Sequence, residues 1–197
     1  MNTDPQVFVV DDDMVVRQAL ELLIGTAGYP VRVFANAEDF LAACGPMTRG
    51  CLILDVRMPG MDGPTLQRVL HERGIKLPII FLTAHGNIPL TVRTIKAGAV
   101  DFLTKPVEAK QLFERIRMAM ELNARFVEAQ ERLAELTERE QEVMMLAVTG
   151  KSNKEIARML DISPRTVEIH RSRVMHKTNA ASLVELADFL KEIERWS

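Results

Sequence analysis

The chain has 197 residues, 47% hydrophobic and 26% charged, with a net charge of -2 at pH 7. This length allows one or two domains with buried cores, and we expect two. No apolar run is long enough to span a bilayer and the first residues do not form a signal peptide, so we expect a cytoplasmic protein without a membrane partner. Cys44 and Cys51 match neither a disulfide framework nor a metal-ligand spacing, and we expect both to be reduced thiols.

The small net charge hides an uneven distribution. Residues 150–178 contain seven Lys or Arg and three acidic residues, so this segment has a charge of about +4 and the rest of the chain about -6. A basic segment on an acidic chain is compatible with nucleic-acid binding by that segment.

Short apolar runs alternate with helical periodicity up to about residue 105. We expect strands at residues 7–10, 31–34, 51–55, 78–82 and 100–104, and helices at residues 15–27, 37–43, 65–72 and 88–97. This alternation predicts an α/β fold with a doubly wound, five-stranded parallel sheet.

Polar residues stand at the ends of four predicted strands. Asp11 and Asp12 follow the first strand, Asp55 ends the third, Thr83 follows the fourth and Lys105 follows the fifth. The carboxyl ends of parallel strands meet at one edge of the sheet, so these side chains are expected to form one site. Clustered carboxylates repel one another, and Mg²⁺ would relieve that repulsion and leave Asp55 ionised to attack phosphorus. For Asp55 considered alone, the alternative is that it caps a turn.

These residues resemble the receiver domain of two-component response regulators. The resemblance covers residues 6–122 and implies a flavodoxin- or CheY-like fold. It rests on Val10-Asp11-Asp12, Asp55 with Met58-Pro59-Gly60 and Gly63, Thr83-Ala84, Lys-Ala-Gly-Ala at residues 96–99, and Phe102 with Lys105-Pro106.

The resemblance also implies the roles of the acidic residues. Asp55 would be the phosphoacceptor. Mg²⁺ would be bound by Asp11 or Asp12, by Asp55 and by the backbone carbonyl of Arg57, whose side chain would not be a ligand.

Thr83 and Lys105 are expected to stabilise the electron-rich phosphoryl group during transfer. The resemblance implies a cis bond between Lys105 and Pro106. It also implies a switch in which Thr83 moves toward the phosphoryl group while Phe102 turns inward; the alternative is that Phe102 is a static core residue.

A dimer surface is expected on the predicted fourth helix and fifth strand. Val92, Ile95 and Lys96 lie on that helix, and Phe102 lies on the strand. Phosphorylation would remodel this face and pair two copies of the chain.

From residue 108 onward the pattern is helical, with no Pro or Gly before Gly150. We therefore expect a receiver domain at residues 1–122, a stiff helical linker at residues 123–135 and a small all-α domain at residues 136–197. The polar composition of the linker predicts a solvent-bridging or coiled helix.

Capping signals divide the last segment into helices. Thr137 and Glu140 form a capping-box pattern that begins one helix, and Ser163 with Pro164 is typical of a helix start that extends to residue 178. A further helix at residues 153–160 precedes this start. Two short helices with basic residues on the second predict a helix-turn-helix, and a pair of bundle helices is the alternative.

Residues 136–189 resemble the LuxR- or FixJ-type four-helix DNA-binding domain. The resemblance rests on Leu-Thr-Glu-Arg-Glu at 136–140, Gly-Lys-Ser-Asn-Lys-Glu-Ile-Ala at 150–157 and Ser-Pro-Arg-Thr-Val-Glu-Ile-His-Arg at 163–171. We expect Val167, Val174 and Thr178 to face the core. The expected DNA-binding residues are Lys154, Arg165, Thr166, Glu168, Ile169, Ser172, Arg173 and Lys177.

These residues suit different parts of DNA. Most suit phosphates, whereas Glu168 can accept a hydrogen bond from cytosine and Ile169 can contact a thymine methyl group. An ion pair with Arg165 or Arg171 is an equal alternative for Glu168. His170 is expected to pack rather than to bind metal.

Together the two resemblances imply a response regulator of the FixJ or NarL class, in which the receiver domain is followed in the chain by the helix-turn-helix domain. The expected partners are a sensor histidine kinase, promoter DNA, a second copy of the chain and RNA polymerase. The resemblance implies activation rather than repression of transcription, and we do not expect an enzyme.

Two other classes are alternatives. A haloacid-dehalogenase-like phosphotransferase or phosphatase has a second Asp two residues after the nucleophile, where this chain has Arg57. A ligand-sensing LuxR-type regulator usually builds an aromatic pocket, whereas this chain has one Tyr, Tyr29, and one Trp, Trp196, and this class leaves the acidic residues at the strand ends unexplained.

Overall fold

The computed structural model describes residues 4–84 and 101–194. The predicted helix at residues 88–97, with Val92, Ile95 and Lys96 of the expected dimer surface, lies outside these residues. The chain divides into two compact units between Arg125 and Phe126. Within the described segments, no helix has the length and apolar character needed to cross a membrane.

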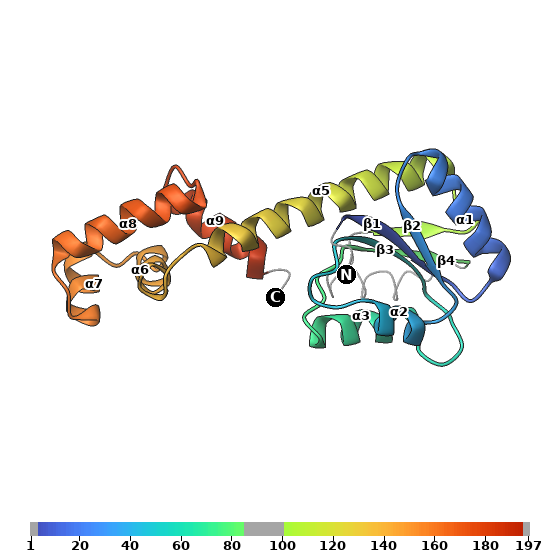
Figure 1. The fold of residues 1–197 in the computed structure, drawn as a ribbon, viewed down its shortest axis with the longest axis horizontal. Coiled ribbons are helices and arrows are strands. Elements are labelled where there is room, and N and C mark those ends of the chain that lie inside the picture. The colour runs from blue at the N-terminus through green and yellow to red at the C-terminus, as the bar shows by residue number, and fades with distance from the viewer. Residues whose placement is uncertain (1–3, 85–100, 195–197) are drawn as a thin grey trace. The chain divides into compact units, whose positions relative to one another are not determined.

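The first unit is a parallel sheet with helices on both faces (Figure 1). Its strands are β1 (Gln6–Val10), β2 (Val31–Phe34), β3 (Gly50–Asp55), β4 (Ile79–Thr83) and β5 (Asp101–Thr104), in the spatial order β2-β1-β3-β4-β5. Its helices are α1 (Met14–Thr26), α2 (Ala37–Ala43), α3 (Gly63–Glu72) and the first part of α5 (Ala109–Ala134). All neighbouring strands are parallel, so the predicted doubly wound α/β fold is confirmed.

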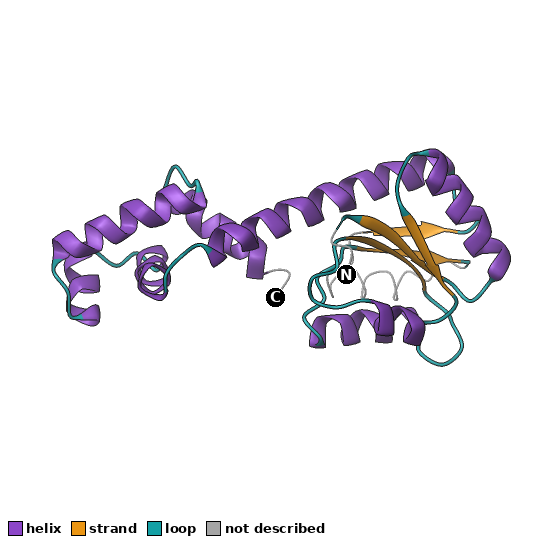
Figure 2. Cartoon of the chain, viewed as in Figure 1, coloured by secondary structure: helices purple, strands orange, loops and turns teal. Residues whose placement is uncertain are grey.

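The sheet is covered on both faces, as its continuous apolar strands predict. Along β1, Val7 and Val9 pack on one side with α1 and α5, whereas Phe8 and Val10 pack on the other side with α2 and α3. Figure 2 shows these two helical layers on either side of the strands. The polar ends of the strands are therefore held by a buried framework.

Asn123 shows that the first unit extends into the predicted linker. Its amide side chain is buried, accepts a hydrogen bond from the backbone N–H of Gly50 (2.8 Å) and donates one to the carbonyl of Lys76 (3.1 Å). Phe126 and Ala129 are also buried. Of the two forms expected for residues 123–135, the solvent-bridging helix is therefore wrong at these three positions, because a polar average does not reveal which individual residues are buried. The coiled helix stays a prediction.

The second unit is helical and contains α6 (Glu138–Val148), α7 (Asn153–Leu160), α8 (Pro164–Thr178) and α9 (Leu183–Glu194). The Thr137–Glu140 capping box begins α6, and Ser163 caps α8 with Pro164 at its start, as predicted. The expected inward face of α8 is confirmed because Val167, Val174 and Thr178 are all buried. The residue patterns thus placed this helix correctly in both extent and rotation.

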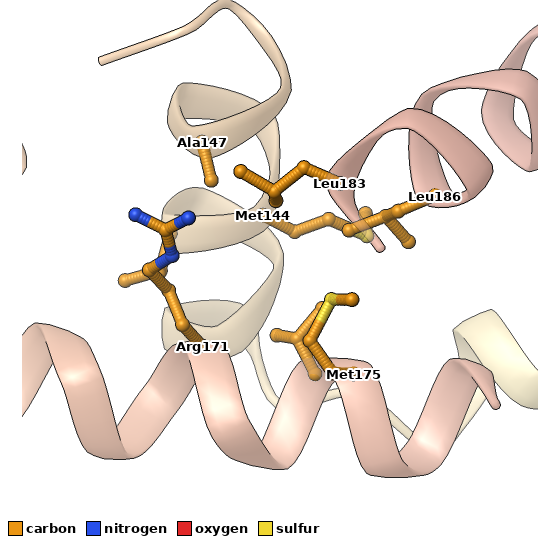
Figure 3. A pocket seen from close by; sticks show the side chains of 8 residues that line it. Met144, Ala147, Arg171, Met175, Leu183 and Leu186 are labelled. Carbon is orange, nitrogen blue, oxygen red and sulfur yellow. The ribbon is translucent and has the colours of Figure 1, made fainter. Parts of the chain in front are cut away.

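A small space remains between α6, α8 and α9 (Figure 3). Its lining is apolar except for Arg171, which stands at one side and donates to Asn153 rather than to anything inside the space. The lining residues are Val143, Met144, Ala147, Arg171, Val174, Met175, Leu183 and Leu186. With no polar group turned inward, this is a gap in core packing and offers no means of orienting a ligand.

Candidate functional site

Two buried carboxylates and one ammonium meet at the carboxyl edge of the sheet. The β1–β3 register pairs Val10 with Leu54, so the next residues, Asp11 and Asp55, stand side by side. Lys105 Nζ lies 2.6 Å from Asp11 Oδ2 and 2.7 Å from Asp55 Oδ1. Asp11 is fully buried and Asp55 is 6% exposed. The structure therefore brings these three predicted residues together.

Burial and pairing oppose each other in this group. Burial raises the pKa of Asp11, and the hydrogen bonds from Lys105 and from the backbone of Asp13 offset only part of that rise. Burial alone would lower the pKa of Lys105, but its contacts with Asp11 and Asp55 raise it. Lys105 is thus held as a cation, and the site carries more negative charge than one ammonium fully compensates.

The three consecutive aspartates have different surroundings. Asp11 faces Lys105, whereas Asp13 is the N-cap of α1, where its Oδ1 accepts from the backbone N–H of Val15 (2.8 Å). Asp12 is exposed, and no hydrogen bond or ion pair is seen for its side chain within the described part of the chain. Asp12 is therefore the carboxylate that is free for an external ligand.

The loop after β3 fixes the other oxygen of Asp55. Asp55 Oδ2 accepts a hydrogen bond from the backbone N–H of Arg57 (2.9 Å), while the Arg57 side chain is exposed. A Cβ at Gly63 would lie 2.5 Å from the backbone oxygen of Asp55 and 2.9 Å from Cε1 of Phe81. Only glycine therefore allows α3 to begin this close to Asp55. The sequence analysis named Gly63 as part of the motif but did not reveal this steric reason.

Thr83 and Phe102 lie on the two strands beyond Asp55. In the β3–β4 register Asp55 pairs with Leu82, so Thr83 is the next residue at the same edge, and it is buried. Phe102 is half-buried and stacks on Phe81 with their ring centroids 5.3 Å apart. The Lys105–Pro106 bond is cis, as predicted.

The carboxylates at this edge of the sheet provide oxygen ligands for a metal ion. Among residues 4–84 and 101–194, no three Asp, Glu, His or Cys side chains form a group able to hold a metal ion by themselves. The predicted set of Asp11, Asp12 and Asp55 is thus not gathered around one point. However, Mg²⁺ commonly uses only one or two carboxylates and fills its octahedron with water and substrate oxygens. Two carboxylates that already share a cation, with exposed Asp12 beside them, fit such an ion.

The outer face of α8 carries most of the expected DNA-binding residues. Arg165, Glu168, Ser172 and Arg173 are exposed, as is Lys154 at the start of α7. Ile169 is 42% exposed on the same face.

Two of the expected polar contacts already have partners within the unit. Arg165 Nη1 lies 2.6 Å from Glu168 Oε2, so the alternative ion pair for Glu168 is present. The Thr166 hydroxyl shares a hydrogen bond of 2.8 Å with Ser163 at the cap of α8. Both pairs are solvent-exposed, so they can rearrange at little cost.

Lys177 differs from the other expected phosphate contacts. Its ammonium donates to Glu140 Oε2 (2.7 Å) and to the carbonyl of Glu135 (2.9 Å). Glu140 is only 2% exposed, and the hydrogen bonds from Lys177 and from the backbone of Thr137 lower its pKa to about 2. Lys177 therefore joins α8 to the start of α6. The sequence analysis assigned it to DNA because helical periodicity does not reveal an acidic partner in another helix.

Two arginines that the sequence analysis did not single out connect the helices of the second unit. Arg171 of α8 donates to Asn153 of α7 (2.6 Å), and Arg139 of α6 donates to the carbonyl of Leu160 at the end of α7. The Ser152–Glu155 capping box begins α7, and its Ser-x-x-Glu pattern is visible in the sequence. The two arginines had no comparable local signal.

His170 was expected to pack. It is half-buried, and its Nδ1 is buried without a hydrogen-bond partner in the part of the chain that the structure describes. This environment agrees with packing.

Comparison with known proteins follows the same division. Residues 7–117 match the response regulator receiver domain, and residues 134–190 match the bacterial regulatory proteins of the luxR family. The chain is 42% identical over 191 residues to the transcriptional regulatory protein TdiR of Thauera aromatica, covering 93% of this chain and 84% of TdiR. It is also 42% identical over 195 residues to the transcriptional regulatory protein FixJ of Bradyrhizobium diazoefficiens, covering 94% of each.

A solved structure gives the same result. The response regulator StyR aligns with a TM-score of 0.60 and 44% identity, over 95% of this chain and 98% of the StyR chain. The two family models match adjacent parts of the sequence, and each of these relatives covers more than nine-tenths of it. The chain therefore belongs to the response regulators that join a receiver domain to a LuxR-type DNA-binding domain.

Proposed function

We propose that a sensor histidine kinase phosphorylates this response regulator on Asp55 and that phosphorylation controls its binding to promoter DNA. The observation that carries the proposal is the contact of Lys105 with both Asp11 and Asp55 at the carboxyl edge of the sheet. A buried carboxylate beside an ammonium and a second carboxylate is suited to receive a phosphoryl group, whose negative charge needs cations on more than one side.

In this scheme Asp55 is the nucleophile. One of its oxygens forms the new O–P bond as the P–N bond of the donor phosphohistidine breaks, and the donor imidazole keeps the electron pair and takes up a proton. The N–H of Arg57 orients the Asp55 carboxylate during attack, and Lys105 turns its ammonium to the phosphoryl oxygens. Thr83, at the end of the next strand, supplies a hydroxyl to the same group.

Asp55, the backbone carbonyl of Arg57 and either Asp11 or Asp12 would hold Mg²⁺. When bound, this ion neutralises charge on the phosphoryl oxygens. The two carboxylates of Asp11 and Asp55 that share one ammonium and the exposed position of Asp12 support the assignment.

Phosphorylation would then change the face that contains Phe102. Because Phe102 is only half-buried, its ring has room to change its exposure when Thr83 is drawn toward the phosphoryl group. We propose that the altered face pairs two receivers, with Val92, Ile95 and Lys96 contributing from outside the described residues.

The second unit would bind the promoter. Lys154, Arg165, Thr166 and Arg173 would contact phosphates, with Ser172 beside them and Lys177 only if it leaves Glu140. Glu168 and Ile169 would face base edges, where Ile169 suits a thymine methyl group. The proposed division is a receiver at residues 1–122, a helical linker at residues 123–135, whose first residue Asn123 is bonded to the first unit, and the DNA-binding domain at residues 136–197.

The protein would act as a regulator rather than as an enzyme. We propose activation of transcription, with RNA polymerase as a further partner. An enzyme with an aspartyl-phosphate intermediate is the alternative, but Arg57 stands where such enzymes of the haloacid-dehalogenase type have their second Asp.

The test compares the wild-type chain with Asp55→Asn. Both proteins are treated with acetyl phosphate and Mg²⁺, analysed by mass spectrometry, and titrated onto a duplex enriched from random-sequence DNA with the treated full-length protein. We expect the wild type to gain one phosphoryl group and to bind the duplex more tightly, and Asp55→Asn to do neither. A phosphoryl group on the Asn variant, or equal DNA binding with and without acetyl phosphate, would contradict the proposal.

A further inference from the structure

We propose that Arg17 is a positioning residue for the acidic turn between β1 and α1: it orients the peptide bond between Asp11 and Asp12 and thereby presents the Asp12 carboxylate to Mg²⁺. This inference rests on the function proposed above. It concerns a cation on α1 that lies beside the site and that the receiver motif does not include.

The contacts of Arg17 carry the inference. Its Nη1 donates a hydrogen bond of 2.6 Å to the backbone carbonyl of Asp11, and its own backbone N–H donates to the carbonyl of Asp13 (3.0 Å). The side chain is half-buried. The guanidinium of Arg17 therefore holds the backbone of the turn directly before Asp12, whereas the bond from its backbone N–H is a hydrogen bond of helix α1 and does not depend on the side chain.

Of the three acidic side chains of the turn, Asp12 is the one for which no hydrogen bond or ion pair is seen within residues 4–84 and 101–194. Asp11 Oδ1 accepts from the backbone N–H of Asp13 (3.0 Å), and Asp13 Oδ1 accepts from the N–H of Val15 (2.8 Å). These bonds fix the aspartates on either side. Asp12 is exposed, so its direction depends on the backbone that carries it.

Because the peptide bond is planar, the hydrogen bond from Arg17 to the Asp11 carbonyl also fixes the direction of the Asp12 side chain. The carbonyl of Asp11, the N–H of Asp12 and the Cα of Asp12 lie in one plane. When Arg17 holds this carbonyl, it also sets the point from which the Asp12 side chain leaves the turn. A guanidinium suits the task because it stays charged and has several donors in a fixed geometry.

A positioning role and a simple charge effect predict opposite results for Mg²⁺. Removing a positive charge near a cation site should strengthen cation binding through Coulomb's law. Loss of a residue that orients a metal ligand instead weakens metal binding, commonly by about 10- to 100-fold. The sign of the change in affinity therefore decides between the two.

The experiment is a Mg²⁺ titration of the full-length protein, monitored through the chemical shifts of the backbone amides in the turn. We expect Arg17→Gln to bind Mg²⁺ at least about tenfold more weakly than the wild type. At saturating Mg²⁺ its rate of phosphorylation by acetyl phosphate should return to near the wild-type rate, because Asp55 and Lys105 are unchanged. Mg²⁺ affinity in Arg17→Gln that equals or exceeds that of the wild type would overturn the inference.

Two further variants keep the test decisive. Arg68→Gln removes the same charge from the exposed Arg68–Glu72 pair of α3, and its Mg²⁺ affinity should stay within about twofold of the wild type. If Arg17→Gln does not fold, Arg17→Lys replaces it: the charge is kept, so weaker Mg²⁺ binding reports the lost donor geometry and unchanged binding overturns the inference.

Failure of this inference is distinguishable from failure of the proposed function. If the wild type takes no phosphoryl group on Asp55, the proposed function is wrong. If the wild type is phosphorylated there and Arg17→Gln binds Mg²⁺ equally well, only the role of Arg17 is wrong.

Discussion

The ammonium of Lys105 lies 2.7 Å from Oδ1 of Asp55, although β4 separates the strands that end near these two residues. The long side chain of Lys105 crosses the end of the intervening strand, and its ammonium also reaches Asp11. One cation therefore serves two buried carboxylates that come from neighbouring strands.

Replacing this cation should destabilise the first unit. Lys105→Met keeps much of the side-chain volume but leaves Asp11 and Asp55 facing each other, and we expect a loss of about 2 kcal/mol at pH 7, less than for a fully buried pair because Lys105 is 19% exposed. The deficit should shrink as the pH falls and Asp11, whose pKa is raised, takes up a proton. Urea unfolding at neutral and acidic pH measures both effects.

Lys191→Met is the control for this prediction. Lys191 pairs with Asp188 on the surface, where both side chains are largely exposed. Its removal should change the free energy of unfolding by less than about 0.5 kcal/mol. Equal losses in the two variants would show that Lys105 contributes only as a surface charge.

Asp12 and Asp13 form a matched pair of adjacent carboxylates. Asp12→Ala should weaken Mg²⁺ binding and slow phosphorylation without loss of stability, because its side chain has no structural partner among the described residues and its charge adds to local repulsion. Asp13→Ala should lower stability by about 1 kcal/mol, because it removes the N-cap of α1. Thermal melting and Mg²⁺ titration separate the effects. A sharp drop in the melting temperature of Asp12→Ala, with Mg²⁺ affinity unchanged, would identify Asp12 as a structural cap.

Gly63→Ala should displace the start of α3 from the backbone of Asp55. The new methyl group would overlap the backbone oxygen of Asp55 and the ring of Phe81, and we expect destabilisation of about 1 to 3 kcal/mol together with slower phosphorylation. Gly25→Ala is the matched control: a Cβ there meets nothing within 4 Å, so the variant should be as stable as the wild type or slightly more stable. Chemical denaturation of both variants is the measurement. A Gly63→Ala protein with wild-type stability would mean that α3 can move away from Asp55 at no cost.

Glu140 should make the second unit sensitive to acid only far below neutral pH. Its pKa is lowered to about 2, so the stability from its pairing with Lys177 is fully present above the usual pKa of glutamate, 4.5, and is lost as the pH falls from there toward 2. The measurement is amide hydrogen exchange in α6 and α8 between pH 4.5 and pH 2, which should become faster as this stability is lost.

Glu140→Gln should remove this pH dependence. The variant should be less stable by about 2 to 3 kcal/mol at pH 7, because the hydrogen bonds to the charged carboxylate are lost. Glu142→Gln, from the exposed pair with Arg139, should cost less than about 0.5 kcal/mol. If the two variants lost equal stability, the Lys177–Glu140 contact would be no stronger than a surface pair.

The sequence alone predicted the elements whose signals are local. The expected bounds of residues 31–34, 37–43, 153–160 and 164–178 agree with β2, α2, α7 and α8, because β-branched runs, caps such as Ser163, and Pro164 act within a few residues. The edge of the site was also predictable, since parallel strands bring their carboxyl ends together. The helix at residues 88–97 lies outside the described residues, so that prediction stays open.

Only the tertiary structure decided how the individual polar groups are paired. Asp11, Asp12 and Asp13 are chemically alike. The sheet order places the end of β1 beside β3 and within reach of the long Lys105 side chain after β5, so Asp11 is the partner of Lys105, Asp13 is a cap and Asp12 has no partner among the described residues. Lys177 and Asn123 likewise found partners 37 and 73 residues away, at Glu140 and Gly50. Periodicity assigns a side chain to a face of its own element, but a pairing depends on the register and depth at which two distant elements meet, and burial then determines its strength.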